Sequence, residues 1–370
     1  MNAERLHAIA IAVKQELQGP NIPKLVSQMV DQLQNVVNQP QQPQHQQQLG
    51  STRSALARHL TDSASNEFSP AWVQAIEELG IRSSLGNPLL ERIENVFVGN
   101  ELTPQLALEA AQVILTDVQG ALKATEQLIS GFTQLGVGHE VLEPGEGEVG
   151  ILLPRSFVHN RFDYLAKEFK ELNSILSVLA EVGTGTSEPL EIRTLSTTDP
   201  FIVLGASLGV LSTIAMAVKP IISAYKEILE VRLLHAQLAE KKISAERLRG
   251  VEEHAEEIMG KAIESVKSAL LESYPSEDIG RRNELNNALG PALSKLANRI
   301  DRGFNVEIRV EPLTDVSEED EEGENTENEE KAQQIEAIRA AVSEMEFMNL
   351  TGQPILHLPE TTSNDESANK

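Results

Sequence analysis

Residues 201–218, FIVLGASLGVLSTIAMAV, decide how this chain is interpreted, because eighteen apolar or small residues follow one another without a charge. As an α-helix the stretch would be about 27 Å long, just enough to cross the hydrocarbon core of a bilayer. Small residues recur at every fourth position, at Gly205, Gly209, Thr213 and Ala217. Such a stripe lets a second helix approach closely, in a membrane or in an oligomer. We therefore predict that it makes a helix-packing contact.

The charges around this stretch argue against a permanent membrane span. Arg193 is the only basic residue shortly before it, whereas Lys219, Lys226 and Arg232 follow it. That asymmetry would place the C-terminal side in the cytoplasm. The long N-terminal portion would then have to cross, and its first residues do not resemble a signal peptide. We expect a buried or oligomer-facing helix, with a constitutive span and a conditional or peripheral insertion as the alternatives.

The same stretch contains a G-x-S-x-G pattern at residues 205–209, with Ser207 in the nucleophile position. In α/β-hydrolases this motif follows a strand, and a later acid and histidine complete the triad. Later histidines exist at His235, His254 and His357. The alternating strands and helices of that fold are missing from the pattern. A serine hydrolase using Ser207 is therefore the competing hypothesis, and helix packing is the favoured one.

A long charged helix is predicted over residues 221–272, because no glycine or proline interrupts it before Gly250. Its apolar residues follow a heptad-like spacing, which is typical of helices packed along a seam. The spacing fits either an antiparallel hairpin or a dimeric coiled coil. The candidate packing residues of this helix are Leu234, Leu238, Leu248, Met259 and Val266.

Strand patterns flank these helices. Residues 190–195 and 306–310 alternate apolar and polar side chains, which indicates strands with one buried face. Residues 139–154 carry two apolar runs around Pro144-Gly145 and predict a hairpin. Residues 157–182 have helical spacing. The predicted fold class is mainly α with a small α+β portion at 136–314: a helical N-terminal region, a short sheet, and a long helical hairpin or coiled coil.

The N-terminal part divides by composition. Residues 1–38 carry helical periodicity on both sides of Gly19-Pro20, and residues 51–135 form a second helical domain. Between them, residues 39–50 are rich in glutamine and contain two prolines, a composition typical of a linker.

The C-terminal part begins with the acidic stretch 315–330, which has ten acidic residues and no basic one. Like charges and few apolar residues predict a mobile linker. The stretch also matches the EF-hand calcium pattern at Glu318, Asp320, Glu322 and Glu329. In a run this acidic the match is nearly forced, so a solvated linker is favoured. Residues 331–370 predict a short amphipathic helix, which docks on its own domain or on a partner, and a polar tail.

Composition sets the functional classes. The chain has 370 residues, with 31 Lys+Arg against 56 Asp+Glu, a formal net charge of −25. A nucleic-acid partner is not expected, because phosphate binding needs a dense basic face. There are no cysteines, which excludes disulfides and thiolate chemistry. We predict no cofactor and no metal. The leading hypothesis is a non-enzymatic, bacterial-type cytoplasmic protein, acting by homo-oligomerisation or protein binding through residues 201–272. Membrane contact would be peripheral, at the inner face of the cell membrane.

Overall fold

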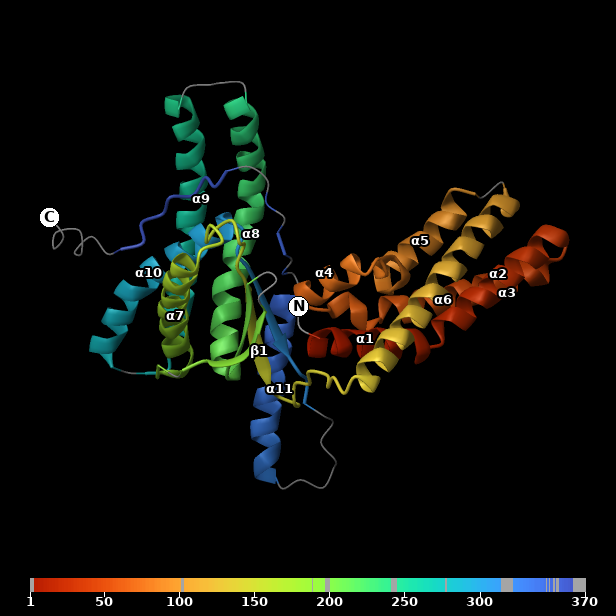
Figure 1. The fold of residues 1–370 in the computed structure, drawn as a ribbon, viewed down its shortest axis with the longest axis horizontal. Helices are drawn as coiled ribbons and strands as arrows, with labels where there is room; N and C mark the ends of the chain where they lie inside the picture. Colours follow the sequence, from red (N-terminus) through yellow and green to blue (C-terminus); the bar gives the residue numbers. More distant parts are fainter. Residues whose placement is uncertain are drawn as a thin grey trace. The chain divides into compact units, whose positions relative to one another are not determined.

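The structure is a computed structural model that describes residues 3–100, 103–187, 189–196, 200–240, 245–276, 278–313, 322–343, 345, 347–348, 350 and 353–361. The chain forms two compact units, Met1–Val141 and Leu142–Lys370 (Figure 1). Over the described residues there are eleven α-helices and one small antiparallel sheet of four strands. The predicted fold class, mainly α with a small α+β portion, is confirmed.

The N-terminal unit is a helical bundle with a single aliphatic core. Its α-helices are α1 (Ala3–Gln18), α2 (Ile22–Asn38), α3 (Pro43–Thr61), α4 (Pro70–Glu78), α5 (Gly86–Val98) and α6 (Pro104–Gln134). Two short 3₁₀ helices, η1 (Ala64–Glu67) and η2 (Arg82–Ser84), connect them. Apolar residues of α1, α2, α3, α5 and α6 pack together in this core. The two predicted helical segments, 1–38 and 51–135, therefore share one core.

The glutamine-rich segment at 39–50 is not a linker, as the sequence predicted, because most of it belongs to α3. Pro43 lies in the first turn of that helix, where its missing N–H costs nothing. Glutamine is a good helix former. Leu49 adds a half-buried contact with the core of the unit. Composition indicated a spacer, and these local preferences with one apolar contact give a helix instead.

The C-terminal unit is built around the sheet, whose strands lie in the order β2-β3-β1-β4 with every neighbouring pair antiparallel. The strands are β1 (Gly147–Leu152), β2 (Glu191–Ser196), β3 (Phe201–Gly205) and β4 (Asn305–Val310). The strands predicted at 190–195 and 306–310 are thus confirmed as β2 and β4, at the two edges. The hairpin predicted at 139–154 is wrong, because β1 instead pairs with β3 and β4.

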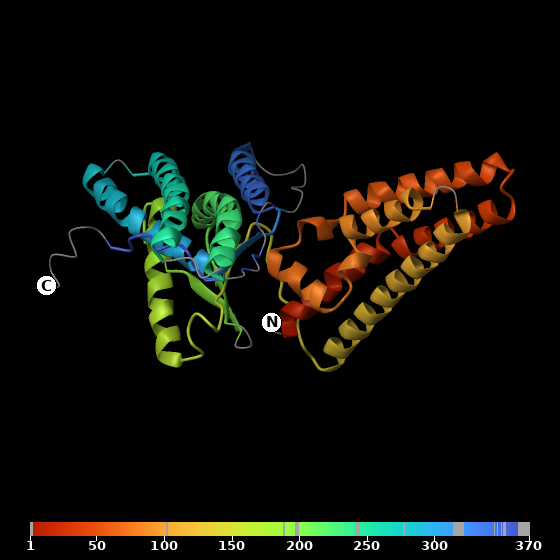
Figure 2. The ribbon, with the colours of Figure 1, turned by 90° about the horizontal axis from the view of Figure 1, so that it is seen from above.

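Helices bury the apolar face of this sheet. They are α7 (Phe162–Thr184), α8 (Leu208–Glu240), α9 (Ala245–Glu272), α10 (Ile279–Asp301) and α11 (Glu322–Val342). Val149 and Ile151 of β1 and Ile308 of β4 join apolar residues of these helices in one core. Helix α8 runs through the middle of the unit, with α9 and α11 on its two sides (Figure 2).

The boundaries predicted for the apolar stretch and the long helix are wrong. Residues 201–205 are strand β3, so the helix predicted at 201–218 begins only at Leu208. Helix α8 then continues through Pro220 to Glu240. The predicted helix at 221–272 is therefore two helices, α8 and α9, which pack against each other. Helices α8 and α9 form an intramolecular hairpin, which is one of the two arrangements left open.

The C-terminal part also differs from its prediction. Helix α11 begins at Glu322, inside the predicted acidic linker at 315–330, and residues 314–321 lie outside the described residues. Ile335 and Ile338 of α11 are buried within the same unit, so the amphipathic helix docks in cis. The tail is not wholly polar in its contacts, because Ile355 and Leu356 are fully buried.

Candidate functional site

The predicted small-residue stripe is used inside the chain. Gly205 is the last residue of β3 and does not lie on the helix. A Cβ atom added to Gly183 of α7 would lie 2.6 Å from the carbonyl oxygen of Gly209 and would also clash with Thr213. Ala217 is fully buried. The glycines therefore allow α7 and α8 to approach closely, as the pattern predicted, but both helices belong to one molecule.

Ser207 is exposed and lies just before the first turn of α8. His235 is 28 residues further along the same helix, which corresponds to about 42 Å of helix. His254 is on α9, and the backbone N–H of His357 donates to Glu256 of α9 at 3.2 Å. Since α9 is antiparallel to α8 across the short connection at 241–244, these two histidines also lie towards the distal half of α8. The structure does not bring a histidine from these helices to Ser207.

The EF-hand pattern does not form a loop over the described residues. Glu322 is the first residue of α11, and Glu329 is an exposed residue in the same helix. A calcium loop must wrap its ligands around the ion, whereas helical side chains point outward at successive angles. Glu318 and Asp320 lie outside the described residues. Within the described ranges, no group of three acidic or histidine side chains could hold a metal ion.

The distal ends of α8 and α9, residues 233–240 and 245–254, form what we call the arm, which extends beyond the rest of the unit (Figure 1). Among the residues of α8 and α9 whose burial is described, the buried ones nearest to the arm are Arg232 on α8 and Ala255 on α9. In the arm, the Nε2 atom of His235 lies 3.1 Å from Glu252 Oε1 and bridges the two helices. The arm is therefore a helix pair with little core of its own.

The predicted packing residues divide between the arm and the core. Leu234 is 48% exposed and its neighbour Leu233 is 56% exposed. Leu238 is half-buried, and Leu248 lies on the α9 side of the arm. Met259 and Val266 are buried in the core of the unit. The part of the predicted seam at Met259 and Val266 is therefore intramolecular, whereas the part in the arm exposes leucines such as Leu234 to solvent.

A buried polar network lies at the base of the arm. The Tyr225 hydroxyl donates to Asp301 Oδ1 at 2.5 Å, and Arg232 Nη1 donates to the same oxygen at 2.7 Å and to the Asp301 backbone carbonyl at 2.6 Å. Tyr225 and Asp301 are fully buried, and Arg232 is 5% exposed. Burial raises the pKa of Tyr225, and the neighbouring Asp301 carboxylate raises it further. The phenol therefore stays a hydrogen-bond donor at neutral pH, and the ion pair fixes α8 to the end of α10.

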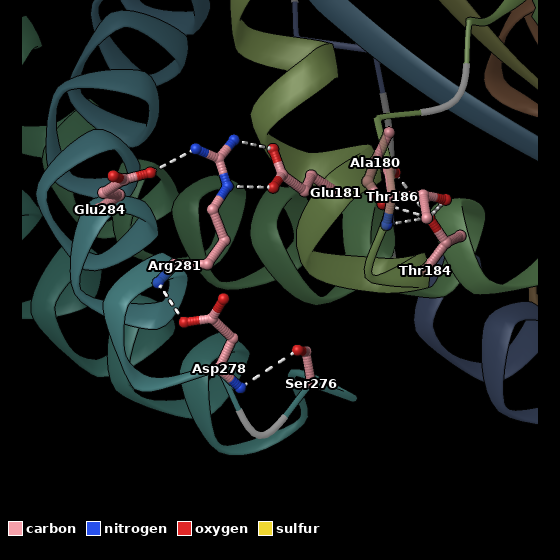
Figure 3. A network of polar contacts seen from close by, with 8 residues as sticks. All are labelled: Ala180, Glu181, Thr184, Thr186, Ser276, Asp278, Arg281 and Glu284. Atoms are coloured by element: carbon pink, nitrogen blue, oxygen red, sulfur yellow. Dashed lines mark hydrogen bonds and ion pairs between the residues drawn. The ribbon is translucent and has the colours of Figure 1, made fainter.

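A second polar network fastens the end of α7 to the start of α10 (Figure 3). Arg281 contacts Glu181 through two hydrogen bonds of 2.5 and 2.7 Å and contacts Glu284 at 2.5 Å. Asp278 caps α10 by accepting from the Arg281 backbone N–H at 3.0 Å. The hydrogen bonds with Glu181 and Glu284 raise the pKa of Arg281, so this arginine remains charged. Its geometry is that of a structural clamp.

Comparison with known proteins yields no family for this chain: no family model matches the sequence, and no curated protein or solved structure shows significant similarity.

Proposed function

We propose that the protein is a non-enzymatic interaction protein that self-associates through its arm. The supporting observation is the exposure of Leu233 and Leu234 at the point where α8 leaves the core. Two adjacent leucines on a projecting helix pair expose apolar surface to water, and burying that surface against a partner would be favourable. A second copy brings the same pair of leucines, and a two-fold contact would bury all four. Binding of a different protein through the same leucines is the alternative.

The rest of the proposal follows the sequence. The net charge of −25 disfavours nucleic acid, and we propose a cytoplasmic location. Within the described residues, one helix segment, Leu208–Leu238, is long and apolar enough to cross a membrane, but 61% of its apolar window is buried inside the structure. This burial favours a role for α8 as a core helix. Contact with a membrane would therefore be limited to the periphery.

Analytical ultracentrifugation of the full chain tests the proposal. We expect the wild type to form a dimer and the Leu233→Ser/Leu234→Ser double variant to dissociate. Each leucine is about half exposed, so its burial contributes on the order of 1 kcal/mol. Four leucines in a two-fold contact thus predict a dissociation constant at least about 100-fold higher in the variant.

The matched control is Leu106→Ser in α6, because Leu106 has a similar exposed fraction, 51%. This variant should retain the wild-type mass. A wild type that stays monomeric at high micromolar concentration would show that the arm does not self-associate. If the double variant were as dimeric as the wild type, the contact would have to lie elsewhere.

A further inference from the structure

Residues 353–361 cross the C-terminal unit as an extended chain with no helix or strand in it. Ile355 and Leu356 are fully buried, whereas His357 between them and Leu358 is exposed. Pro354 and Pro359 bracket the central residues 355–358. Proline disfavours a helix before it and restricts its own backbone, so the bracket keeps the segment extended.

Every backbone N–H between the two prolines donates to a side chain of α9 or α10. Ile355 and Leu356 donate to Asp301 Oδ2 at 2.7 and 2.8 Å. His357 donates to Glu256 Oε1 at 3.2 Å. Leu358 donates to Asn298 Oδ1 at 3.1 Å, and the Asn298 amide donates back to the Leu358 carbonyl at 3.0 Å. The helices thus bind the segment through its peptide groups.

The carboxylate of Asp301 joins this segment to the base of the arm. Its Oδ2 atom serves Ile355 and Leu356, while Oδ1 accepts from Tyr225 and Arg232. Both oxygens are therefore used, in a place where the residue is fully buried. A carboxylate that accepts two adjacent amide N–H groups is a strong, charge-assisted contact. An extended peptide with free amides is the ligand that this arrangement fits.

Asn305 bonds Met348, which lies just before this segment in the sequence, in the same way. Its Oδ1 atom accepts from the Met348 N–H at 2.7 Å, and its amide lies 3.5 Å from the Met348 carbonyl. The bonded partners therefore run antiparallel: as the C-terminal segment goes from Met348 to Leu358, its partners go from Asn305 back to Asn298. Side chains that hydrogen-bond peptide groups do not distinguish one sequence from another, because every peptide has the same backbone. Selectivity for the ligand's side chains would come from the buried Ile355 and Leu356 positions. Domains that recognise extended peptides combine these two features.

We propose that the side chains of Asp301, Asn298 and Glu256 form a peptide-binding site. Its ligand is an extended segment with two adjacent large aliphatic residues, and residues 353–361 occupy it in cis as its resident ligand. The same sequence supplied in trans replaces the resident segment once that segment is cut from the rest of the chain. This inference does not depend on self-association through the arm.

The test uses the full chain, folded before any cut is made. A specific protease site is inserted between Gly352 and Gln353, and the purified protein is then cleaved. A fluorescent peptide with the sequence of residues 353–361 is added, and binding is followed by anisotropy. We expect saturable binding, one peptide per chain, to the cleaved protein only. Circular dichroism before and after cleavage monitors the fold.

Peptide variants report on selectivity without disturbing the protein. An Ile355→Ser/Leu356→Ser peptide should bind at least about 100-fold more weakly, since two fully buried aliphatic side chains are lost. A His357→Ser peptide is the matched control and should bind like the original, because this side chain is exposed. In the protein, Asn298→Ala should weaken binding by at least roughly 10-fold, because it removes two hydrogen bonds with the Leu358 backbone and one with the Glu360 side chain.

Two results would overturn the proposal. The first is a cleaved, folded protein that takes up no added peptide. The second is equal binding of the Ile355→Ser/Leu356→Ser and His357→Ser peptides, which would show adhesion without selectivity.

Discussion

Replacing Asp301 with asparagine should strongly destabilise the C-terminal unit. The change removes the negative charge that pairs with Arg232, which is 5% exposed and would keep its charge in the interior. Breaking one side of a buried ion pair costs about 3–5 kcal/mol. It also weakens the acceptor for Ile355 and Leu356. These losses overlap, so we expect about 4 kcal/mol, a large fraction of the ~5–15 kcal/mol that stabilises a typical domain.

Urea unfolding measured with two probes locates this effect. Far-UV circular dichroism follows both units, because both are helical. Trp72, the only tryptophan, lies in the N-terminal unit, so its fluorescence follows that unit. We expect Asp301→Asn to lower the stability seen by circular dichroism and to leave the fluorescence transition in place.

Two further variants identify the cause. Asp278→Asn is the control on the same helix, because this exposed residue caps α10 and asparagine caps nearly as well. It should cost less than about 0.5 kcal/mol. Adding Arg232→Met to Asp301→Asn removes the buried charge that Asp301 pairs with and should recover part of the loss. The reasoning fails if Asp301→Asn costs no more than Asp278→Asn, or if Arg232→Met only adds to the damage.

Three other changes should have measurable effects. Gly209→Leu should lower the free energy of unfolding by several kcal/mol, because a Cβ there would lie 3.2 Å from the Gly183 carbonyl oxygen; urea unfolding measures this, and an unchanged midpoint would contradict the packing. Pro220→Ala should raise stability by roughly 1 kcal/mol, since alanine supplies an N–H for the Met216 carbonyl; thermal melting decides the sign. Tyr225 should ionise only above pH 10, because burial raises the pKa of its hydroxyl. Because its folded pKa is raised, its contribution is complete below pH 10 and is lost as pH rises above it. Ultraviolet titration of the native protein and of a Tyr225→Phe variant would refute this if the two curves differed near pH 10 and not above it.

The alternation of apolar and polar residues located both edge strands, although it did not predict their burial: Ile192 of β2 is 72% exposed, and Glu307 of β4 is buried along with its apolar neighbours. Residues 306–310 alternate because the valine and isoleucine face the core while Glu307 and Arg309 lie on the other side of the sheet. Strand β3 was hidden, because Phe201, Ile202 and Val203 are all buried and read as one apolar run with the helix that follows. Periodicity cannot separate a short strand buried on both faces from a helix.

The polar network at the base of the arm could not be predicted from local pattern. Arg232 and Asp301 are 69 residues apart, and neither belongs to a motif. A weak signal existed at Asn298 and Asp301, which are three residues apart on a helix end that also carries the apolar residues Leu296, Ala297 and Ile300. Two polar residues on a buried helix face imply a polar ligand for them. Their ligand is the backbone of residues 355–358, whose side chains give no indication that their peptide groups are the bonded part.

The fate of the apolar helix follows from the strands on either side of it. Strand β3 ends three residues before α8 begins, and β4 follows α10. Both pair with β1, at registers that include Val149 with Leu204 and Val149 with Ile308. A helix that permanently crossed a bilayer at α8 would leave β3 on one side and oblige the chain to return before β4. Because a single strand bonds both neighbours, we expect the segments before and after α8 to lie in the same compartment. The lack of charge over residues 208–218 accords with the packing of α8 against α7, α9 and α11, a surrounding that hydropathy alone does not distinguish from lipid.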